Sequence, residues 1–170
     1  MSPRRRVAVA EHLLAGVTTT TDMYFFGNDV AHTLASAGMR GVVAESLIGF
    51  PTPRCKTTAD MLAKQRELIE EYKNHPLITP SVAAHAPYSV QASDLVAEAD
   101  LAEEYEVPMQ IHLSETAWEV DKLLDEKGLS PVAYLADLGV LSDRTVAAHC
   151  VHVSREEMGS RADFHAGVAD

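Results

Sequence analysis

Residues 107–120, VPMQIHLSETAWEV, decide the fold class and locate the chemistry of this sequence. The run 107–111 is mostly apolar and reads as a buried strand, but it ends in His112, followed closely by Ser114 and Glu115. A strand that served packing alone would more often close on a turn residue. A histidine and a carboxylate three residues apart at the end of a buried strand therefore indicate the mouth of a functional site.

The same pattern, a β-rich run followed by an amphipathic helix, repeats along the whole chain. β-Branched, aromatic and other apolar residues mark each run as a strand. The runs are continuously apolar, which is typical of parallel strands that are buried on both faces. Five strands are expected, within residues 16–26, 40–50, 76–88, 107–115 and 144–152.

Helices are expected between these strands. The first begins with Thr57 or Thr58 as its N-cap, and the last is broken into two near Gly128 and Pro131. Strands that alternate with helices of 10 to 15 residues imply parallel βαβ units, so the fold class is α/β. The clearest helical stretches are residues 57–75, 89–107 and 116–140.

The chain reads as a single domain, residues 1–170, because it contains no low-complexity linker. Its net charge of −11 argues against a nucleic-acid partner, since phosphate contacts need clustered Lys and Arg. The apolar runs are shorter than the ~20 residues of a membrane span, and no signal peptide is recognisable. We therefore expect no membrane partner. Cys55 and Cys150 form no CxxC pair, so we expect a reducing compartment, the cytoplasm.

Three of the eight histidines, His85, His112 and His149, lie at expected strand ends. One such histidine is more often a structural residue, but three at the carboxyl ends of parallel strands should converge on a site. Imidazole suits zinc or another divalent metal, and a catalytic metal site keeps one position open for water. Glu115 could reach that water as a proton shuttle, although HxxE alone is a weak motif.

Five motifs, taken in order, resemble a known family: GVTTTTDMYFF, GMRGVVAESL, HAPYS, IHLSET and AAHCVH. Together they resemble the amidohydrolase superfamily and its cytosine-deaminase-like branch, which holds 5-methylthioadenosine/S-adenosylhomocysteine deaminases and triazine chlorohydrolases. The resemblance runs from about residue 7 to about residue 157 and leaves a divergent tail, 158–170. It implies a partial (β/α)8 TIM-type metal-dependent hydrolase barrel, with about strands 2 to 6 present.

The resemblance also implies roles for the strand-end residues. His112 matches the metal ligand at the end of barrel strand five, where zinc is the expected metal and iron is used by some relatives. Glu115 matches the acid/base that contacts the substrate and moves protons onto the ring and the leaving amine. His149 matches the strand-six histidine that holds the attacking water or polarises the substrate. His85 matches a substrate-contacting position on strand four.

Other residues of the family motifs are expected to have supporting roles. His152 is expected to be structural, and Asp22 to make a buried hydrogen bond. Glu45 stands where members that act on adenosine thioethers tend to carry an arginine. Arg54, in the following loop, is the cation that would partly compensate.

The sequence departs from the family pattern at both ends. The HxH pair of barrel strand one and the Asp of strand eight are both missing, and His165 lies in a tail without strand character, so it is not expected to replace them. One histidine, even with help from His149, falls short of the three protein ligands of a catalytic zinc site. We therefore expect this chain to be an internal fragment of a longer deaminase.

The expected function of the full-length parent is hydrolytic deamination of an aminated heterocycle or nucleoside, with an adenosine-type small molecule as the substrate. Two alternatives stay open. The chain could be a non-catalytic remnant or a half-barrel completed by a partner, since its strand edges would be unpaired. The parent could instead be an amide or chloride hydrolase on the same scaffold. The sequence also leaves the oligomeric state open, a homo-oligomer included.

Overall fold

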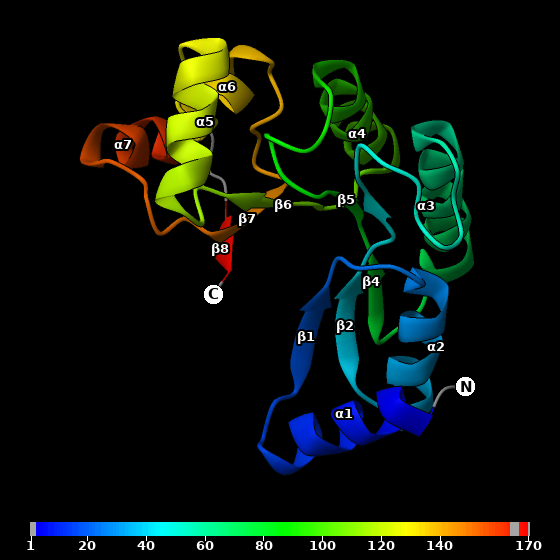
Figure 1. Ribbon diagram of the computed structural model, residues 1–170. Helices are drawn as coiled ribbons and strands as arrows, with labels where there is room; N and C mark the ends of the chain where they lie inside the picture. Colours follow the sequence, from blue (N-terminus) through cyan, green and yellow to red (C-terminus); the bar gives the residue numbers. More distant parts are fainter. Residues whose placement is uncertain (1–2, 164–166, 170) are drawn as a thin grey trace.

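The computed structural model of the chain describes residues 3–163 and 167–169 (Figure 1). Strands and helices alternate along the chain, as the sequence predicts. The strands are β1 (Thr19–Asp22), β2 (Arg40–Val43), β3 (Ser46–Leu47), β4 (Ile78–Pro80), β5 (Val82–Ala84), β6 (Met109–Leu113), β7 (Thr145–His149) and β8 (Gly167–Ala169). The helices are α1 (Pro3–Leu14), α2 (Gly27–Ala37), α3 (Thr58–Tyr72), α4 (Ala92–Tyr105), α5 (Ala117–Lys127), α6 (Pro131–Asp137) and α7 (Arg155–Asp163).

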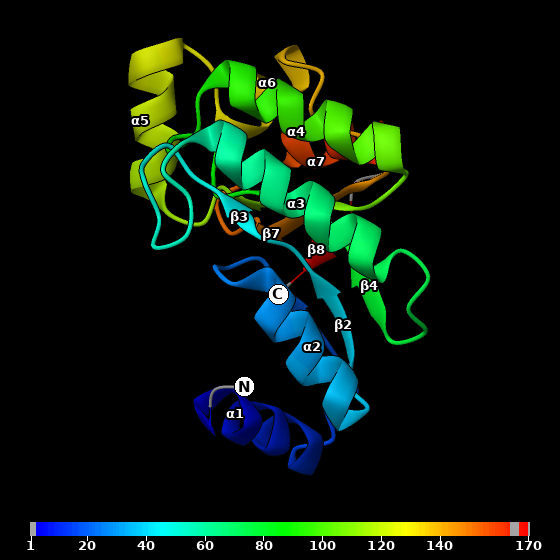
Figure 2. The same ribbon diagram turned by 90° about the vertical axis from the view of Figure 1, so that its right-hand side faces the viewer.

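All neighbouring strands pair in parallel. One sheet has the order β1-β2-β4 and the other has the order β3-β5-β6-β7-β8. β2 continues into β3 through residues 44–45, and β4 continues into β5 through Ser81, so the two sheets form one bent wall. Helices α2 to α6 lie along its convex side (Figures 1 and 2). The expected architecture, an incomplete parallel α/β barrel, is confirmed.

Capping chemistry sets the start of α3. The Thr57 hydroxyl accepts a hydrogen bond from the Asp60 amide at 3.1 Å, and the Asp60 carboxylate accepts one from the Thr57 amide at 3.0 Å. This reciprocal pair is a capping box, which satisfies two backbone donors at the helix start. Of the two predicted N-caps, Thr57 is therefore the correct one.

The predicted break in the helical stretch 116–140 is confirmed. α5 ends at Gly128, whose φ of +70° is a left-handed conformation that glycine adopts without strain. The next helix follows at once, because the Ser130 hydroxyl accepts from the Ala133 amide and Pro131 occupies the first helical position. α5 and α6 therefore form separate helices.

Buried side chains form two clusters. The larger one fills the space around the five-stranded sheet and includes Leu47, Leu95, Ile111 and Leu135. The smaller one lies against the three-stranded sheet and consists of Val9, Ala31, Leu34, Met39, Val43, Leu68, Tyr72 and Ile78. α3 contributes to both clusters and so connects the two halves of the wall.

The C-terminal tail contains more structure than expected. β8 pairs in parallel with residues 146–148 of β7, so the expectation of a tail without strand character is wrong for residues 167–169. The outer edge of β7 offers unpaired backbone groups, and a short run of small residues can pair with them. His165 lies outside the described residues.

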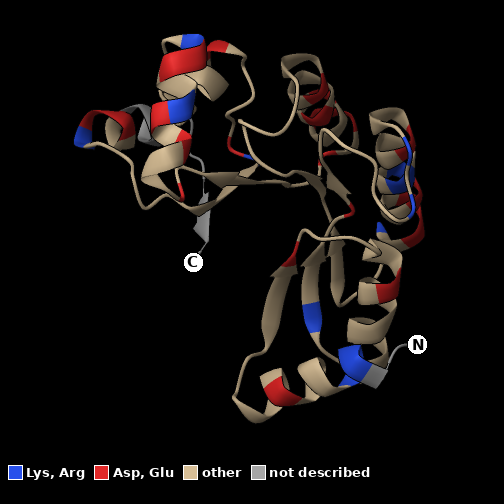
Figure 3. Ribbon diagram, viewed as in Figure 1, with Lys and Arg blue, Asp and Glu red and all other residues tan. Residues whose placement is uncertain are grey.

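Charged side chains lie mainly on the helices, and the strands carry few of them (Figure 3). This distribution fits a net charge of −11 carried on the solvent-facing layer. Within the described part of the chain, none of the helices has the length and apolar character that crossing a bilayer requires.

Candidate functional site

The three strand-end histidines lie together. His85 follows β5 directly, His112 is the fourth residue of β6, and His149 is the last residue of β7. The ring centres of His85 and His112 are 5.2 Å apart, and those of His112 and His149 are 5.3 Å apart with the planes stacked at 17°. The predicted convergence is therefore present, because parallel register brings the ends of β5, β6 and β7 to one edge.

Hydrogen bonds orient two of these rings and fix the tautomer of His112. His112 Nδ1 lies 2.7 Å from the backbone oxygen of His85, which can only accept, so Nδ1 carries the proton and Nε2 keeps its lone pair. This is the arrangement of a metal-ligating histidine, which usually donates its other ring N–H to a backbone carbonyl or carboxylate. His85 Nδ1 is held at 2.7 Å from the Ser89 hydroxyl, and burial beside His112 lowers the pKa of His85.

Glu115 lies on the loop after β6, within reach of the histidine rings. Its Oε2 is 3.7 Å from Nε2 of His149, and the two side chains are 48% and 36% exposed, so both are accessible to a small molecule. The backbone around them is unusual: Ser114, His149 and Cys150 all have positive φ values, of 50°, 73° and 53°. Such strained conformations in non-glycine residues concentrate at functional sites.

The Glu119 carboxylate holds the loop that carries Glu115 in place. The sequence did not lead us to expect this role for Glu119. One carboxylate oxygen accepts from the Ser114 amide at 3.0 Å and the other accepts from the Glu115 amide at 2.9 Å. Glu119 is only 1% exposed, and burial raises its pKa, although these amide hydrogen bonds lower it. The spacing of Thr116 and Glu119, typical of a capping box, was the available signal.

Two aromatic residues extend the row of rings. Tyr88 lies edge-on to His85 with ring centres 6.0 Å apart, and Trp118 lies edge-on to Tyr88 at 5.3 Å. Burial and the nearby Glu119 and Glu115 carboxylates raise the pKa of Tyr88. Tyr88 therefore lies next to His85 and near Glu115. The sequence shows that residue 88 is aromatic, but it does not show that its ring lies beside these residues.

Glu45 is part of the fold and does not face an open site. It is 2% exposed, and its Oε2 accepts a hydrogen bond from the Gly27 amide at 2.7 Å. This carboxylate caps α2, whose own N-cap residue, Phe26, makes no side-chain cap. The Arg54 guanidinium lies 5.6 Å from the centre of the Phe26 ring, and a contribution of Arg54 to substrate binding stays a prediction.

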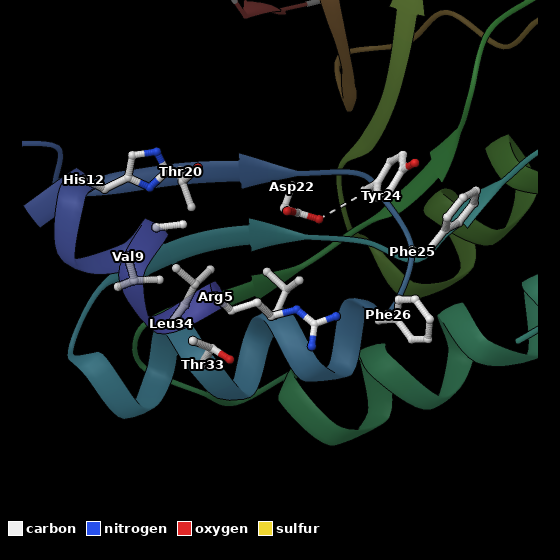
Figure 4. Close-up of a pocket in the computed structure, with 12 residues that line it drawn as sticks. Arg5, Val9, His12, Thr20, Asp22, Tyr24, Phe25, Phe26, Thr33 and Leu34 are labelled. Carbon is white, nitrogen blue, oxygen red and sulfur yellow. Dashed lines mark hydrogen bonds between the residues drawn. The ribbon is translucent and has the colours of Figure 1, made fainter. Parts of the chain in front are cut away.

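Asp22 lies apart from the histidines. It is half-buried, and burial raises its pKa. It accepts a hydrogen bond from the Tyr24 amide at 3.2 Å, but this bond is local and exposed, so the expectation of a buried hydrogen bond is wrong. With Arg5, Thr20 and other side chains it lines a cavity of about 300 Å³ between α1, β1 and α2 (Figure 4). This cavity shares no residue with the histidine cluster.

His152 lies beyond the strand end, as expected. Its backbone amide donates to the carbonyl of Ser114 at 2.8 Å, and its side chain is exposed. This hydrogen bond links the segment after β7 to the exit of β6. A structural role is in keeping with this position.

The described residues fit part of a metal site. His112 presents the tautomer of a ligand, but nowhere in residues 3–163 and 167–169 do three His, Cys, Asp or Glu side chains gather so that they could hold a metal. A catalytic zinc site uses three protein ligands. The described residues therefore do not form a complete metal site by themselves.

This fold is a segment of a parallel α/β barrel with histidines at the carboxyl ends of its strands, and comparison with known proteins identifies the family. Residues 6–167 match the family model described as Amidohydrolase family. The chain belongs to the amidohydrolase family.

Relatives of known name are similar over almost the whole chain. The 5-methylthioadenosine/S-adenosylhomocysteine deaminase of Thermodesulfovibrio yellowstonii is 42% identical over 96% of this chain, and the 5'-deoxyadenosine deaminase of Methanothrix thermoacetophila is 35% identical over 96%. The chain spans 37% and 38% of these two relatives.

Solved structures have the same fold. The adenosine deaminase of Xanthomonas campestris, crystallised with bound zinc, has a TM-score of 0.94 and 31% identity, over 96% of this chain and 37% of that one. The atrazine chlorohydrolase of Arthrobacter aurescens TC1, also with zinc, has a TM-score of 0.84 and 23% identity, over 96% of this chain and 40% of that one. At this lower identity the likeness concerns the fold alone.

Proposed function

We propose that this chain carries part of the active site of a hydrolytic deaminase that acts on aminated heterocycles, with adenosine-type nucleosides as the preferred class. The observation that carries the proposal is the meeting of His85, His112, His149 and Glu115 at one edge of the wall. The names of the relatives support the same substrate class. The sequence contains no CxxC pair, which supports a reducing compartment, the cytoplasm.

Proton transfer is assigned to Glu115. Hydrolysis adds a water oxygen to the ring carbon that bears the amine, and the water proton passes through Glu115 to the neighbouring ring nitrogen. A second proton then moves through Glu115 to the amine, the carbon–nitrogen bond breaks, and ammonia leaves as the ring carbonyl forms. Orientation of the attacking water is assigned to His149, whose Nε2 lies 3.7 Å from Glu115. Contact with the substrate is assigned to His85, whose ring lies beside that of His112.

His112 is assigned as a metal ligand through Nε2, because Nδ1 is engaged with the carbonyl of His85. A divalent cation, zinc or alternatively iron, would acidify the attacking water. Among the described residues, no group of three His, Cys, Asp or Glu side chains is arranged to hold this cation, so the site needs ligands beyond those gathered here.

The test is release of ammonia from 5-methylthioadenosine by the 170-residue chain with added zinc. Glu115→Gln is expected to lower the rate by about 100-fold or more, since general acid–base catalysis contributes on the order of 10² to 10⁴. Asp125→Asn, on the exposed face of α5, is the matched control and should retain the rate. Equal rates for Glu115→Gln and the unsubstituted chain would refute the role of Glu115.

A second candidate function is a non-catalytic module that is completed by a partner. The incomplete ligand set among the described residues favours it. Ammonia release no faster than in buffer, together with sub-stoichiometric zinc after dialysis, would support this second function and reject the first for this chain.

A further inference from the structure

Five aromatic rings form a continuous row along the edge of the candidate site. The row runs from His149 through His112, His85 and Tyr88 to Trp118. The spacings between successive ring centres are 5.3, 5.2, 6.0 and 5.3 Å. The proposed chemistry occupies the histidine end, which leaves the Tyr88 and Trp118 end without an assigned role.

Trp118 is exposed although it is the largest apolar side chain available. It is 60% exposed, whereas Tyr88, which separates it from His85, is half-buried. An edge-on contact with Tyr88 covers little of the indole face, and the Lys122 ammonium lies 5.8 Å from the ring centre. Leaving an indole ring in water forgoes the apolar burial that Trp usually contributes.

The position of Trp118 is fixed by the loop that carries Glu115. Thr116 caps α5 through the Glu119 amide, and Glu119 in turn binds the amides of Ser114 and Glu115. Trp118 is the second residue of this helix. The ring is therefore held at a set distance from the catalytic candidate, as a binding residue requires.

We propose that Trp118 and Tyr88 form a subsite for the apolar thioether end of a substituted adenosine, and that they set the preference for such substrates over adenosine. This inference rests on the proposed deaminase function. With the aminated ring at His112 and Glu115, the substituent of the ribose extends past His85 toward Tyr88 and Trp118. Sulfur is polarizable and makes favourable contacts with aromatic rings, whereas a hydroxyl group at the same place would lose its hydration.

Trp118 is also the only tryptophan of the chain, so it reports its own contacts by fluorescence. We expect 5-methylthioadenosine to change this fluorescence saturably, at a concentration about tenfold lower than adenosine needs. In calorimetry, Trp118→Leu should weaken binding of 5-methylthioadenosine by about tenfold and binding of adenosine by no more than about twofold.

Tyr24→Leu is the matched control, because Tyr24 is 68% exposed and lies outside the row of rings. It should leave both affinities unchanged. Thermal melting of both variants separates loss of binding from loss of folding. Retained preference for the thioether in Trp118→Leu would overturn the subsite and leave the deaminase proposal standing. Absence of nucleoside binding to the unsubstituted chain would overturn both.

Discussion

At the scale of single residues, Glu98 is the clearest case of a carboxyl group kept out of water. It is 0% exposed, and its Oε1 accepts a hydrogen bond from Gln65 Nε2 at 2.7 Å. The same Gln65 amide group donates to the carbonyl of Glu45 at 2.9 Å. Burial raises the pKa of Glu98 to about 8, so this side chain is protonated in the folded chain at neutral pH.

This protonation makes the stability of the chain depend on pH. Since the folded pKa of Glu98 is about 8 and the unfolded value is 4.5, the folded state holds the proton more tightly. The contribution of Glu98 to the free energy of unfolding is fully present below pH 4.5. It falls as Glu98 ionises in the unfolded state, and it is lost as the pH rises through about 8. In the unsubstituted chain, we expect the free energy of unfolding to fall by on the order of a few kcal/mol over this pH range. Glu98→Gln mimics the protonated form and should reduce this fall.

Urea unfolding of the unsubstituted chain and of Glu98→Gln, at several pH values between 5 and 8.5, measures how the free energy of unfolding depends on pH. Asp100→Asn, on the exposed face of the same helix, is the control and should reproduce the pH dependence of the unsubstituted chain. Parallel stability curves for Glu98→Gln and the unsubstituted chain would show that Glu98 is not the group responsible.

The sequence revealed some site residues and not others for a physical reason. His85, His112 and His149 were predictable because parallel strands bring their carboxyl ends to one edge, whatever the details of the loops. The spacing of Thr116 and Glu119 signals a helix cap, but the contacts of Glu119 and Trp118 with the site depend on the conformation of the turn after β6, including a positive φ at Ser114. No periodicity in a sequence encodes that conformation.

At the scale of elements, the start of α2 is packed directly against the bend between β2 and β3. An added Cβ on Gly27 would lie 2.7 Å from the carbonyl oxygen of Ala44, closer than such contacts allow. The same glycine donates its amide to the buried Glu45 carboxylate. Close packing at the start of α2 therefore depends on the absence of a side chain at Gly27.

Gly27→Ala should destabilise the chain by about 1 to 3 kcal/mol, because overpacking against the backbone cannot be relieved by side-chain movement. Gly159→Ala is the matched comparison: it lies within α7, and an added Cβ would meet nothing within 4 Å. It should stabilise the chain by about 0.5 to 1 kcal/mol. Thermal or urea unfolding measures both, and equal effects of the two substitutions would contradict the packing argument.

Most elements were predictable, but the bends were not. Capping residues such as Thr57 and Pro131 mark helix boundaries through local chemistry that the sequence displays. The interruption of two strands at residues 44–45 and at Ser81 arises from the curvature of the wall, to which distant residues contribute. β8 was missed because its pairing depends on the edge of β7 and not on its own three residues.

At the scale of the whole molecule, the wall leaves a strand edge open. β1 pairs with β2 on one side, and within the described residues no strand pairs with its other side. Thr19 and Thr21 on this strand are exposed. Open parallel edges favour association between chains.

We expect the chain to associate as its concentration rises, and Thr21→Lys to reduce this association. A lysine at a strand edge disfavours pairing with another strand. Ser36→Lys, on the exposed surface of α2, makes the same change in net charge and should not reduce association. Sedimentation velocity over a range of concentrations measures the mass, and equal behaviour of the two variants would exclude the β1 edge as the contact.

The separation of the buried side chains into two clusters has a consequence for local opening. Among the residues that the structure describes, the smaller cluster contains 8 buried residues and the larger one 22. Regions with fewer buried apolar contacts open at lower free energy, in cooperative units. Amide hydrogens of β1, β2 and α2 should therefore exchange with solvent deuterium as one group, before those of β6 and β7. The strands that present the histidines would then keep their protection while the other half of the wall opens and closes.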